Sequence, residues 1–444
     1  MKNKKLIIIA ILIVTVIAIS VGFFSKGRKN ENKSAAITGI KLVDSFKVRP
    51  LTDIHYERTA QRLKQGKYLA EGILMCFTCH SPRNMDLPGA PLYDDKKGSG
   101  GTLVYEDSTT RLIAPNITPD NETGAGTWTD DMLARSIREG VGHDGRALNW
   151  QMPYNIFRNI SDEDLASVIV YLRSLPPVYN VVEHTKFSKE ERSQIEKSMR
   201  PIFNPVATPD FTDPVKRGMY LVRLGECVGC HTSHSEYNPG LFAGGNFVYR
   251  YGHKAFSANL TSHPSGITYG PEAFIFVLRT GKGGALSPAM PWISFKNIND
   301  DDLKAIYAYL RSLPPNQHYV SNQQPFTHCE ICGEMHGNGD KNKRETPPGI
   351  KIDPELYDQY TGTFQEDEWK NVYILTRKGT KLLTKGWETG PEHELVPQTE
   401  LRFIGAGLPL PLTFVKDKDG RITELKEETD YGRVFKKIKK ESSL

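Results

Sequence analysis

The spacing of apolar and polar residues predicts helices in the first three quarters of the chain. Ser161 and three acidic residues precede apolar positions spaced three or four apart, which is typical of a capped helix with one buried face. Asn299 and three aspartates begin a second segment of the same kind. Two further helices are predicted to end at Gly140 and Gly281, because glycine readily adopts the left-handed conformation found after many helices.

The pattern changes after Pro347, where apolar residues alternate with polar ones in short segments. Turn dipeptides such as Lys378-Gly379 and Asp419-Gly420 separate these segments. A period of two indicates strands with one buried face. We therefore predict a small antiparallel β domain over residues 350–440.

An uninterrupted run of apolar and small residues extends from Leu6 to Phe24 and follows three lysines. As a helix it would be roughly 28 Å long, close to the hydrocarbon thickness of a bilayer. The run is longer than the apolar core of most signal peptides and lacks an Ala-x-Ala cleavage site. We predict a retained membrane anchor within residues 1–30, with a cleaved signal peptide as the alternative. Either one places the rest of the chain on the extracytoplasmic, periplasmic side.

Four sequence blocks occur twice in the same order, which predicts a tandem repeat. Each copy ends at a Pro-Pro pair that no helix can continue through. We expect two mainly α domains at 55–178 and 213–316, with linkers at 179–212 and 317–347. The paired blocks are KYLAEGILMCFTCHS and MYLVRLGECVGCHT, APNITPD and SANLTSH, MPY and MPW, and DLASVIVYLRSLPP and DLKAIYAYLRSLPP.

Each copy contains one Cys-x-x-Cys-His motif, the attachment sequence for c-type haem. Two thiols three residues apart can both reach the vinyl groups of one porphyrin, while the next histidine binds the iron. A thioredoxin-like pair needs no such histidine, and a zinc site normally needs a second pair of ligands. We predict two covalent haems, with Cys76, Cys79, His80, Cys227, Cys230 and His231 as the attachment residues.

Methionine is the expected sixth ligand of each iron, because a soft thioether suits ferrous iron and raises the reduction potential. Met152 and Met290 both occur in a Met-Pro-aromatic context just before the last helix of their copy. Met85 and Met132 compete in the first copy, but neither has the repeated context. The alternative for the two candidates is an ordinary place in the hydrophobic core.

A third Cys-x-x-Cys pair, Cys329 and Cys332, is followed by glycine and therefore lacks the haem ligand. His328 and His336 flank the pair. These residues can form a disulfide, remain free thiols, bind zinc or copper, or attach a haem. Four metal ligands within nine residues would strain a tetrahedral shell. The sequence leaves these outcomes open.

The helical region resembles the dihaem and trihaem cytochrome c subunits of membrane-bound alcohol and gluconate dehydrogenases. The shared features are G-x-Y-L, the haem motif, AGG, Asn-Ile/Leu-Thr, Met-Pro-Tyr/Trp and YLRSLPP. This resemblance implies His/Met ligation, an electron-accepting role and a position near the haem edge for Asn116 and Asn259. A simple turn role is the alternative for both asparagines. His143 is expected to be a loop or propionate-side residue rather than a ligand.

Residues 354–438 resemble the lipocalin-like barrel domain appended to many serine β-lactamase-like proteins. The resemblance rests on ELYDQYTGTF, HELVPQTELRF and LTFVKDKDGRITEL. It brings no catalytic residue and implies a binding or packing module.

Length and charge complete the prediction of a multidomain protein with an N-terminal transmembrane helix. The chain has 444 residues and a net charge of +5, a balance that does not indicate a nucleic-acid partner. We predict an electron-transfer subunit, without a catalytic residue of its own, between a dehydrogenase or quinol-side donor and a downstream acceptor. The alternatives are a dihaem enzyme of peroxidase or thiosulfate-oxidising type and a haem-based redox sensor with a ligand-binding β domain.

Overall fold

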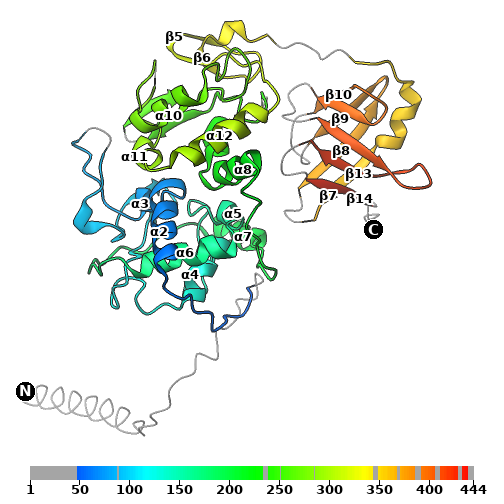
Figure 1. The fold of residues 1–444 in the computed structure, drawn as a ribbon. Helices are drawn as coiled ribbons and strands as arrows, with labels where there is room; N and C mark the ends of the chain where they lie inside the picture. Colours follow the sequence, from blue (N-terminus) through cyan, green and yellow to red (C-terminus); the bar gives the residue numbers. More distant parts are fainter. Residues whose placement is uncertain are drawn as a thin grey trace, which may run out of the picture. The chain divides into compact units, whose positions relative to one another are not determined.

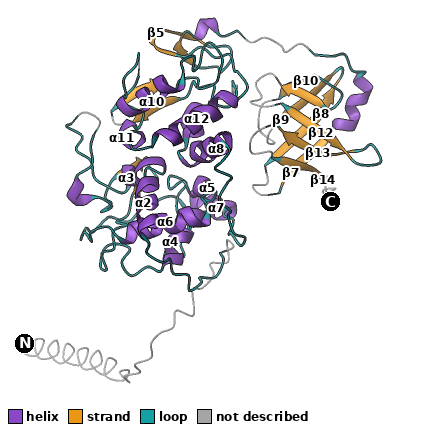
Figure 2. Cartoon of the chain, in the orientation of Figure 1, coloured by secondary structure: helices purple, strands orange, loops and turns teal. Residues whose placement is uncertain are grey.

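The computed structural model describes residues 48–438 except 88–89, 234–238, 251, 285, 344–348, 368–370, 386–391, 406–410 and 429–432. Helices dominate the part before residue 313, and strands dominate the part after residue 361 (Figures 1 and 2). Among the described residues, no helix is both long and apolar enough to cross a membrane. The predicted anchor at residues 6–24 lies outside the described residues.

The first unit, residues 55–178, is built from short helices and one small hairpin, and a further helix follows it. Its elements are α2 (Ala60–Tyr68), the π-helix η1 (Leu69–Ile73), α3 (Cys76–Cys79), η2 (Asp94–Lys96), β1 (Leu103–Glu106), β2 (Arg111–Ile113), α4 (Asp130–Glu139), α5 (Tyr154–Phe157) and α6 (Asp162–Arg173), and the helix after it is α7 (Lys189–Ser198).

The second unit, residues 213–316, has a similar order of helices around a similar small hairpin. Its elements are α8 (Pro214–Leu224), α9 (Cys227–His231), β3 (Phe247–Arg250), β4 (His253–Phe256), α10 (Pro271–Thr280), α11 (Trp292–Phe295) and α12 (Asp300–Ser312). A second hairpin follows it, made of β5 (Ser321–His328) and β6 (Met335–Gly337), and then the short η3 (Gly339–Lys341).

The predicted helix ends are confirmed. The Ser161 hydroxyl accepts a hydrogen bond from the Asp164 amide at 3.2 Å and so caps α6. The Asn299 side chain caps α12 in the same way. Gly140 and Gly281 end α4 and α10 with φ angles of 70° and 60°, in the left-handed region.

The first and last helices of each unit cross closely because a glycine lies at each crossing. A Cβ atom at Gly66 of α2 would lie 1.9 Å from the backbone oxygen of Ser167 in α6. At Gly218 of α8 it would lie 2.0 Å from the backbone oxygen of Ala305 in α12. No side chain fits at either point. This is the physical reason for the glycine in the repeated G-x-Y-L sequence.

One hydrophobic core joins the two units, and buried residues of both contribute to it. Tyrosine–aspartate hydrogen bonds cross between the units in a reciprocal manner. The Tyr68 hydroxyl of the first unit donates to Asp302 of the second. The Tyr220 hydroxyl of the second unit donates to Asp164 of the first at 2.7 Å. Each tyrosine follows a crossing glycine by two residues, so the same motif packs helices within a unit and joins the two units.

The segment 179–212, predicted to be a linker, contains α7 and bonds to the first unit. The backbones of Lys186 and Arg111 exchange hydrogen bonds at 2.7 and 2.8 Å. The Glu191 carboxylate in α7 accepts hydrogen bonds from Thr110 and Asn149 at 3.0 and 2.6 Å. This segment therefore braces the loops of the first unit.

The C-terminal strands form a closed, antiparallel, eight-stranded barrel in the order β10-β11-β12-β13-β14-β7-β8-β9. Buried aromatic residues such as Tyr360, Phe364, Phe403 and Phe414 form its core, each exposed by 1 % or less. The elements are η4 (Pro354–Tyr360), β7 (Gly362–Glu366), β8 (Val372–Lys378), β9 (Lys381–Lys385), β10 (His393–Pro397), β11 (Arg402–Gly405), β12 (Leu412–Lys416), β13 (Ile422–Glu427) and β14 (Val434–Ile438).

We predict that Gly66→Ala lowers the free energy of unfolding by about 1–3 kcal/mol, because the added methyl group forces α2 away from α6. Gly72→Ala is the matched control in the adjoining π-helix. Its Cβ would have no neighbour closer than 3.8 Å, so stability should stay within about 1 kcal/mol of the parent. Denaturant titration of both holoproteins, followed by circular dichroism, measures the difference. Equal stability of the two variants would contradict the close crossing.

Candidate functional site

The two Cys-x-x-Cys-His motifs form matching helical turns. Cys76 and Cys79 begin and end α3, while Cys227 begins α9. In both units the residue before the first cysteine has a left-handed conformation, which separates the turn from the preceding helix. Burial raises the pKa of the Cys76 and Cys227 thiols to about 12. They are thus protonated thiols, the state that adds to a vinyl group to form a thioether.

The histidine of each motif is held by one ring nitrogen. His80 Nδ1 lies 2.9 Å from the Pro115 carbonyl oxygen, and His231 Nδ1 lies 2.8 Å from that of Ala258. A carbonyl oxygen can only accept, so Nδ1 carries the proton and Nε2 has a lone pair for a metal. Burial lowers the pKa of both imidazoles, which keeps them neutral. The donor set therefore fits a haem iron.

One glycine in each unit brings the backbone of the motif histidine close to the residue whose carbonyl accepts from its ring. The Gly100 amide donates to the His80 carbonyl oxygen at 2.9 Å, and the Gly244 amide donates to that of His231 at 2.8 Å. Both glycines have positive φ angles, 72° and 75°. A Cβ atom at Gly100 would lie 2.4 Å from the Pro115 carbonyl carbon. Only glycine lets the backbone of this loop pass so close to the residue that holds the histidine.

The candidate ligands Met152 and Met290 occupy equivalent turns. Their amides donate to the residues three positions earlier, at 3.0 and 3.2 Å, and their carbonyls accept from the amides two positions later, at 2.7 and 2.8 Å. Tyr154 and Trp292, two residues after these methionines, pack on Gly140 and Gly281, the glycines that end α4 and α10. A Cβ at Gly140 would lie 2.6 Å from the Tyr154 ring. The repeated Met-Pro-aromatic sequence thus has a structural reason, and iron ligation by the two methionines stays a prediction.

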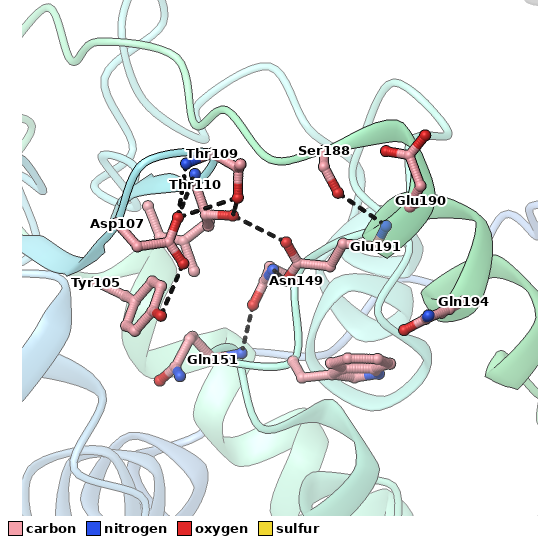
Figure 3. Close-up of a pocket in the computed structure, with 12 residues that line it drawn as sticks. Tyr105, Asp107, Thr109, Thr110, Asn149, Gln151, Ser188, Glu190, Glu191 and Gln194 are labelled. Atoms are coloured by element: carbon pink, nitrogen blue, oxygen red, sulfur yellow. Dashed lines mark hydrogen bonds between the residues drawn. The ribbon is translucent and has the colours of Figure 1, made fainter.

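A polar pocket of about 490 Å³ lies beside the loop that leads to Met152 (Figure 3). Asn149 donates to Glu191 of α7 at 2.6 Å and accepts from the Gln151 amide at 3.0 Å. Tyr105 and Asp107 of the β1–β2 hairpin also line the pocket (Figure 3). None of the haem-attachment residues does. Its polar contacts hold the methionine loop, and we assign no ligand to the pocket.

Asn116 and Asn259 are buried braces of the loops that carry the carbonyl acceptors. The Asn116 side chain donates to the Val178 carbonyl at 2.8 Å and accepts from the Thr118 amide at 3.0 Å. Asn259 makes the matching bonds to the carbonyl of Asn316 and to the Thr261 amide. Each asparagine directly follows a histidine-holding residue. These bonds support the turn role, and the predicted position at the haem edge stays a prediction.

His143 lies in a loop, as expected, and stacks on Trp128 with ring centroids 4.3 Å apart. Partial burial lowers its pKa, so the ring is neutral near pH 7. Its Nδ1 atom is buried and has no hydrogen-bond partner within the described part of the chain. A position of His143 beside a haem propionate stays a prediction.

The two motifs share one electrostatic environment. Burial raises the pKa of Cys79 in the first unit and of Cys230 in the second. In both cases the Arg250 guanidinium lowers the pKa and the Glu226 carboxylate raises it. The charges of Glu226 and Arg250, both in the second unit, therefore act on the last cysteine of both motifs.

The third cysteine pair requires a correction to the predicted set of neighbours. Cys329, Cys332 and His336 are buried together, but His328 is exposed and lies outside their group. Side chains alternate between the two sides of a strand, so His328 at the end of β5 points away from the side that the next residue faces. Neither cysteine forms a disulfide with a described residue.

Sequence reasoning missed the two carbonyl acceptors, Pro115 and Ala258. A backbone acceptor leaves no signature in residue type, because every residue has a carbonyl. The available signal was positional. In both copies the acceptor directly precedes the repeated Asn-x-Thr block. A block that recurs at the same point of a repeat indicates a turn that both copies need.

Comparison with known proteins gives partial matches to components of dehydrogenases. The chain is 30 % identical to a subunit of nicotinate dehydrogenase from Pseudomonas putida, over 57 % of this chain and 22 % of that protein. It is 28 % identical to the gluconate 2-dehydrogenase cytochrome c subunit of Pantoea cypripedii, over 66 % and 67 % respectively. The fructose dehydrogenase cytochrome subunit of Gluconobacter japonicus is 28 % identical, over 67 % and 62 %.

The chain thus spans between about a fifth and two thirds of the length of these relatives. No family model matches it. The similarity to cytochrome c subunits supports a cytochrome with covalently bound haem and a role in electron transfer.

We predict that Asn116→Asp costs about 1–3 kcal/mol of unfolding free energy, because a carboxylate cannot donate to the Val178 carbonyl. Asn159→Asp is the control, since the Asn159 side chain is exposed and, among the described residues, bonds only to the nearby Ile156 carbonyl. Thermal unfolding and reduction potential should be measured on both holoproteins. An Asn116 variant with unchanged stability and a shifted haem potential would contradict the turn role.

Proposed function

We propose that this protein is a membrane-anchored dihaem cytochrome c that accepts electrons from a dehydrogenase or quinol-side donor and passes them to a downstream acceptor. The observation that carries the proposal is the repeated ligand geometry. In each unit two thiols flank one helical turn, and the next histidine has its Nδ1 bonded to a carbonyl. Bound haem supplies one-electron redox chemistry at such a site.

The protein's own contribution is to hold and tune two such sites. His231 is buried, while His80 and the four cysteines of the motifs are half-buried, and burial is one factor that sets a haem potential. The shared core and the reciprocal Tyr68–Asp302 and Tyr220–Asp164 bonds hold the two units together. Electron tunnelling falls steeply with distance, so a constant separation between the sites supports transfer between them.

The charges of Glu226 and Arg250 act on the last cysteine of both motifs, so the two sites share part of their electrostatic environment. These two charges are opposite in sign and partly offset each other.

The β barrel supports a packing or docking role rather than a small-ligand cavity. Eight strands enclose a space that side chains can just fill or that can hold one small ligand. Fully buried rings such as Phe364 and Phe414 occupy the core of this barrel. We therefore place the redox chemistry in the helical units and propose no ligand for the barrel, whose lipocalin-like character stays a prediction.

We predict that Met152→His and Met290→His each abolish the long-wavelength absorption band of Met-ligated ferric haem at one site only. Each substitution should also lower the potential of its own haem, because a thioether ligand raises the potential. Met85→His is the matched control, since Met85 is exposed and lacks the repeated context. An unchanged spectrum in either variant shows that its methionine is not the ligand.

The experiment that tests the function uses the full chain in membranes of cells that attach haem to it. Fractionation followed by haem staining should find the chain in the membrane fraction. Rapid mixing with a quinol should then reduce one haem first and the second by internal transfer, with a rate independent of quinol concentration. A soluble chain argues against the anchor. A stable high-spin haem that consumes peroxide argues for the dihaem enzyme instead.

A further inference from the structure

His318 joins the third cysteine pair, although it lies eleven residues before Cys329 in the sequence. His318, Cys329, Cys332 and His336 each offer one ligand atom, and these atoms all lie within 4.8 Å of one another. All four side chains are buried, with exposures between 0 and 1 %. Two thiols and two imidazoles are a common ligand set of structural zinc sites.

We propose that His318, Cys329, Cys332 and His336 bind one structural zinc ion. The distances fit this metal. Cys329 Sγ lies 3.5 Å from His318 Nε2, and Cys332 Sγ lies 3.3 Å from His336 Nε2. A tetrahedral zinc with Zn–S of about 2.3 Å and Zn–N of about 2.0–2.1 Å separates sulfur from nitrogen by roughly 3.5 Å.

Both histidines are oriented as metal ligands are. His318 Nδ1 lies 2.9 Å from the Ala243 carbonyl oxygen, and His336 Nδ1 lies 3.1 Å from that of Gly337. In both rings Nδ1 therefore holds the proton, while Nε2 faces a cysteine sulfur with its lone pair. Metal-bound histidines commonly donate their second nitrogen to a carbonyl in this way, which orients the ring.

The backbone around the cysteines also fits a metal site. The Cys329 amide donates to the Glu334 carbonyl and the Gly333 amide to the Cys329 carbonyl, both at 2.9 Å. The Cys332 amide lies 3.4 Å from the Cys329 sulfur and points a donor at it. Gly333 has a φ of 78°, which closes this turn. The amide donor of Cys332 stabilises the thiolate form of Cys329 rather than the thiol.

Charge balance explains how a cation can occupy so buried a place. Two thiolates neutralise Zn²⁺, and the two imidazoles remain neutral, so the filled site carries no net charge. The cost of burying an isolated ion is thereby avoided. Four protein ligands and complete burial leave no open position for water or substrate. The ion therefore has a structural role rather than a catalytic one.

The site stabilises the loop that holds the second haem histidine. His318 bonds to Ala243, and the next residue, Gly244, donates to the His231 carbonyl at 2.8 Å. A Cβ at Gly245 would lie 2.5 Å from the His318 ring, so the glycine lets the ring approach the loop. Zinc would thus link the β5–β6 hairpin to the second unit. Among its described residues, the first unit has no equivalent histidine–cysteine cluster.

The test measures metals in the purified, haem-loaded full chain by elemental mass spectrometry. We expect one zinc and two irons per chain. The Cys329→Ser/Cys332→Ser double variant should lose zinc and keep both irons, while His328→Ala, beside Cys329 but exposed, should keep all three metals. The thermal midpoint should fall in the double variant only. Fewer than two irons per chain in the parent protein would contradict the haem assignment and leave the zinc proposal unaffected.

A second measurement on the unsubstituted protein decides the case even if the double variant fails to fold. Denaturation with a chelator, alkylation and mass spectrometry should show both Cys329 and Cys332 as free thiols. A disulfide between them would overturn the proposal. So would copper in place of zinc, a chain without any metal besides iron, or zinc retained in the double variant.

Discussion

An imidazole can offer iron only one nitrogen, and this chain bonds the other nitrogen of each haem-motif histidine to a backbone carbonyl. Pro115 holds His80 and Ala258 holds His231. That hydrogen bond selects the tautomer and the ring orientation together, so the loops that carry the carbonyls decide whether a ligand is available. The paired glycines and the buried asparagines of these loops serve this one placement, and the zinc proposed behind the second loop would serve it as well.

Placement of the histidines also ties the two units to each other. The helix that precedes each motif contains the crossing glycine and carries the tyrosine that bonds to the other unit. A change at Gly66 therefore disturbs packing within the first unit and the Tyr68–Asp302 contact between units. The two haem sites that we propose would share this core and exchange electrons without a docking step, which suits an electron carrier.

The sequence predicted local features correctly, but it did not predict contacts between residues that are distant in the chain. The Ser161 cap and the Gly140 helix end depend on a few neighbouring residues, so their patterns were sufficient. His318 was missed because it follows the last helix of its unit and reaches the cysteines only through folding of the hairpin. His328 was a plausible neighbour by number, but strand alternation turns it to the solvent. Carbonyl acceptors such as Pro115 leave no mark in residue type.

The central claim is that each of the two motifs carries a covalent haem, and intact mass spectrometry tests it most directly. The mature chain should be heavier than its polypeptide by two haem groups, and peptide mapping should place one on Cys76 and Cys79 and the other on Cys227 and Cys230. A colourless chain with no added mass at these sulfurs would contradict the account.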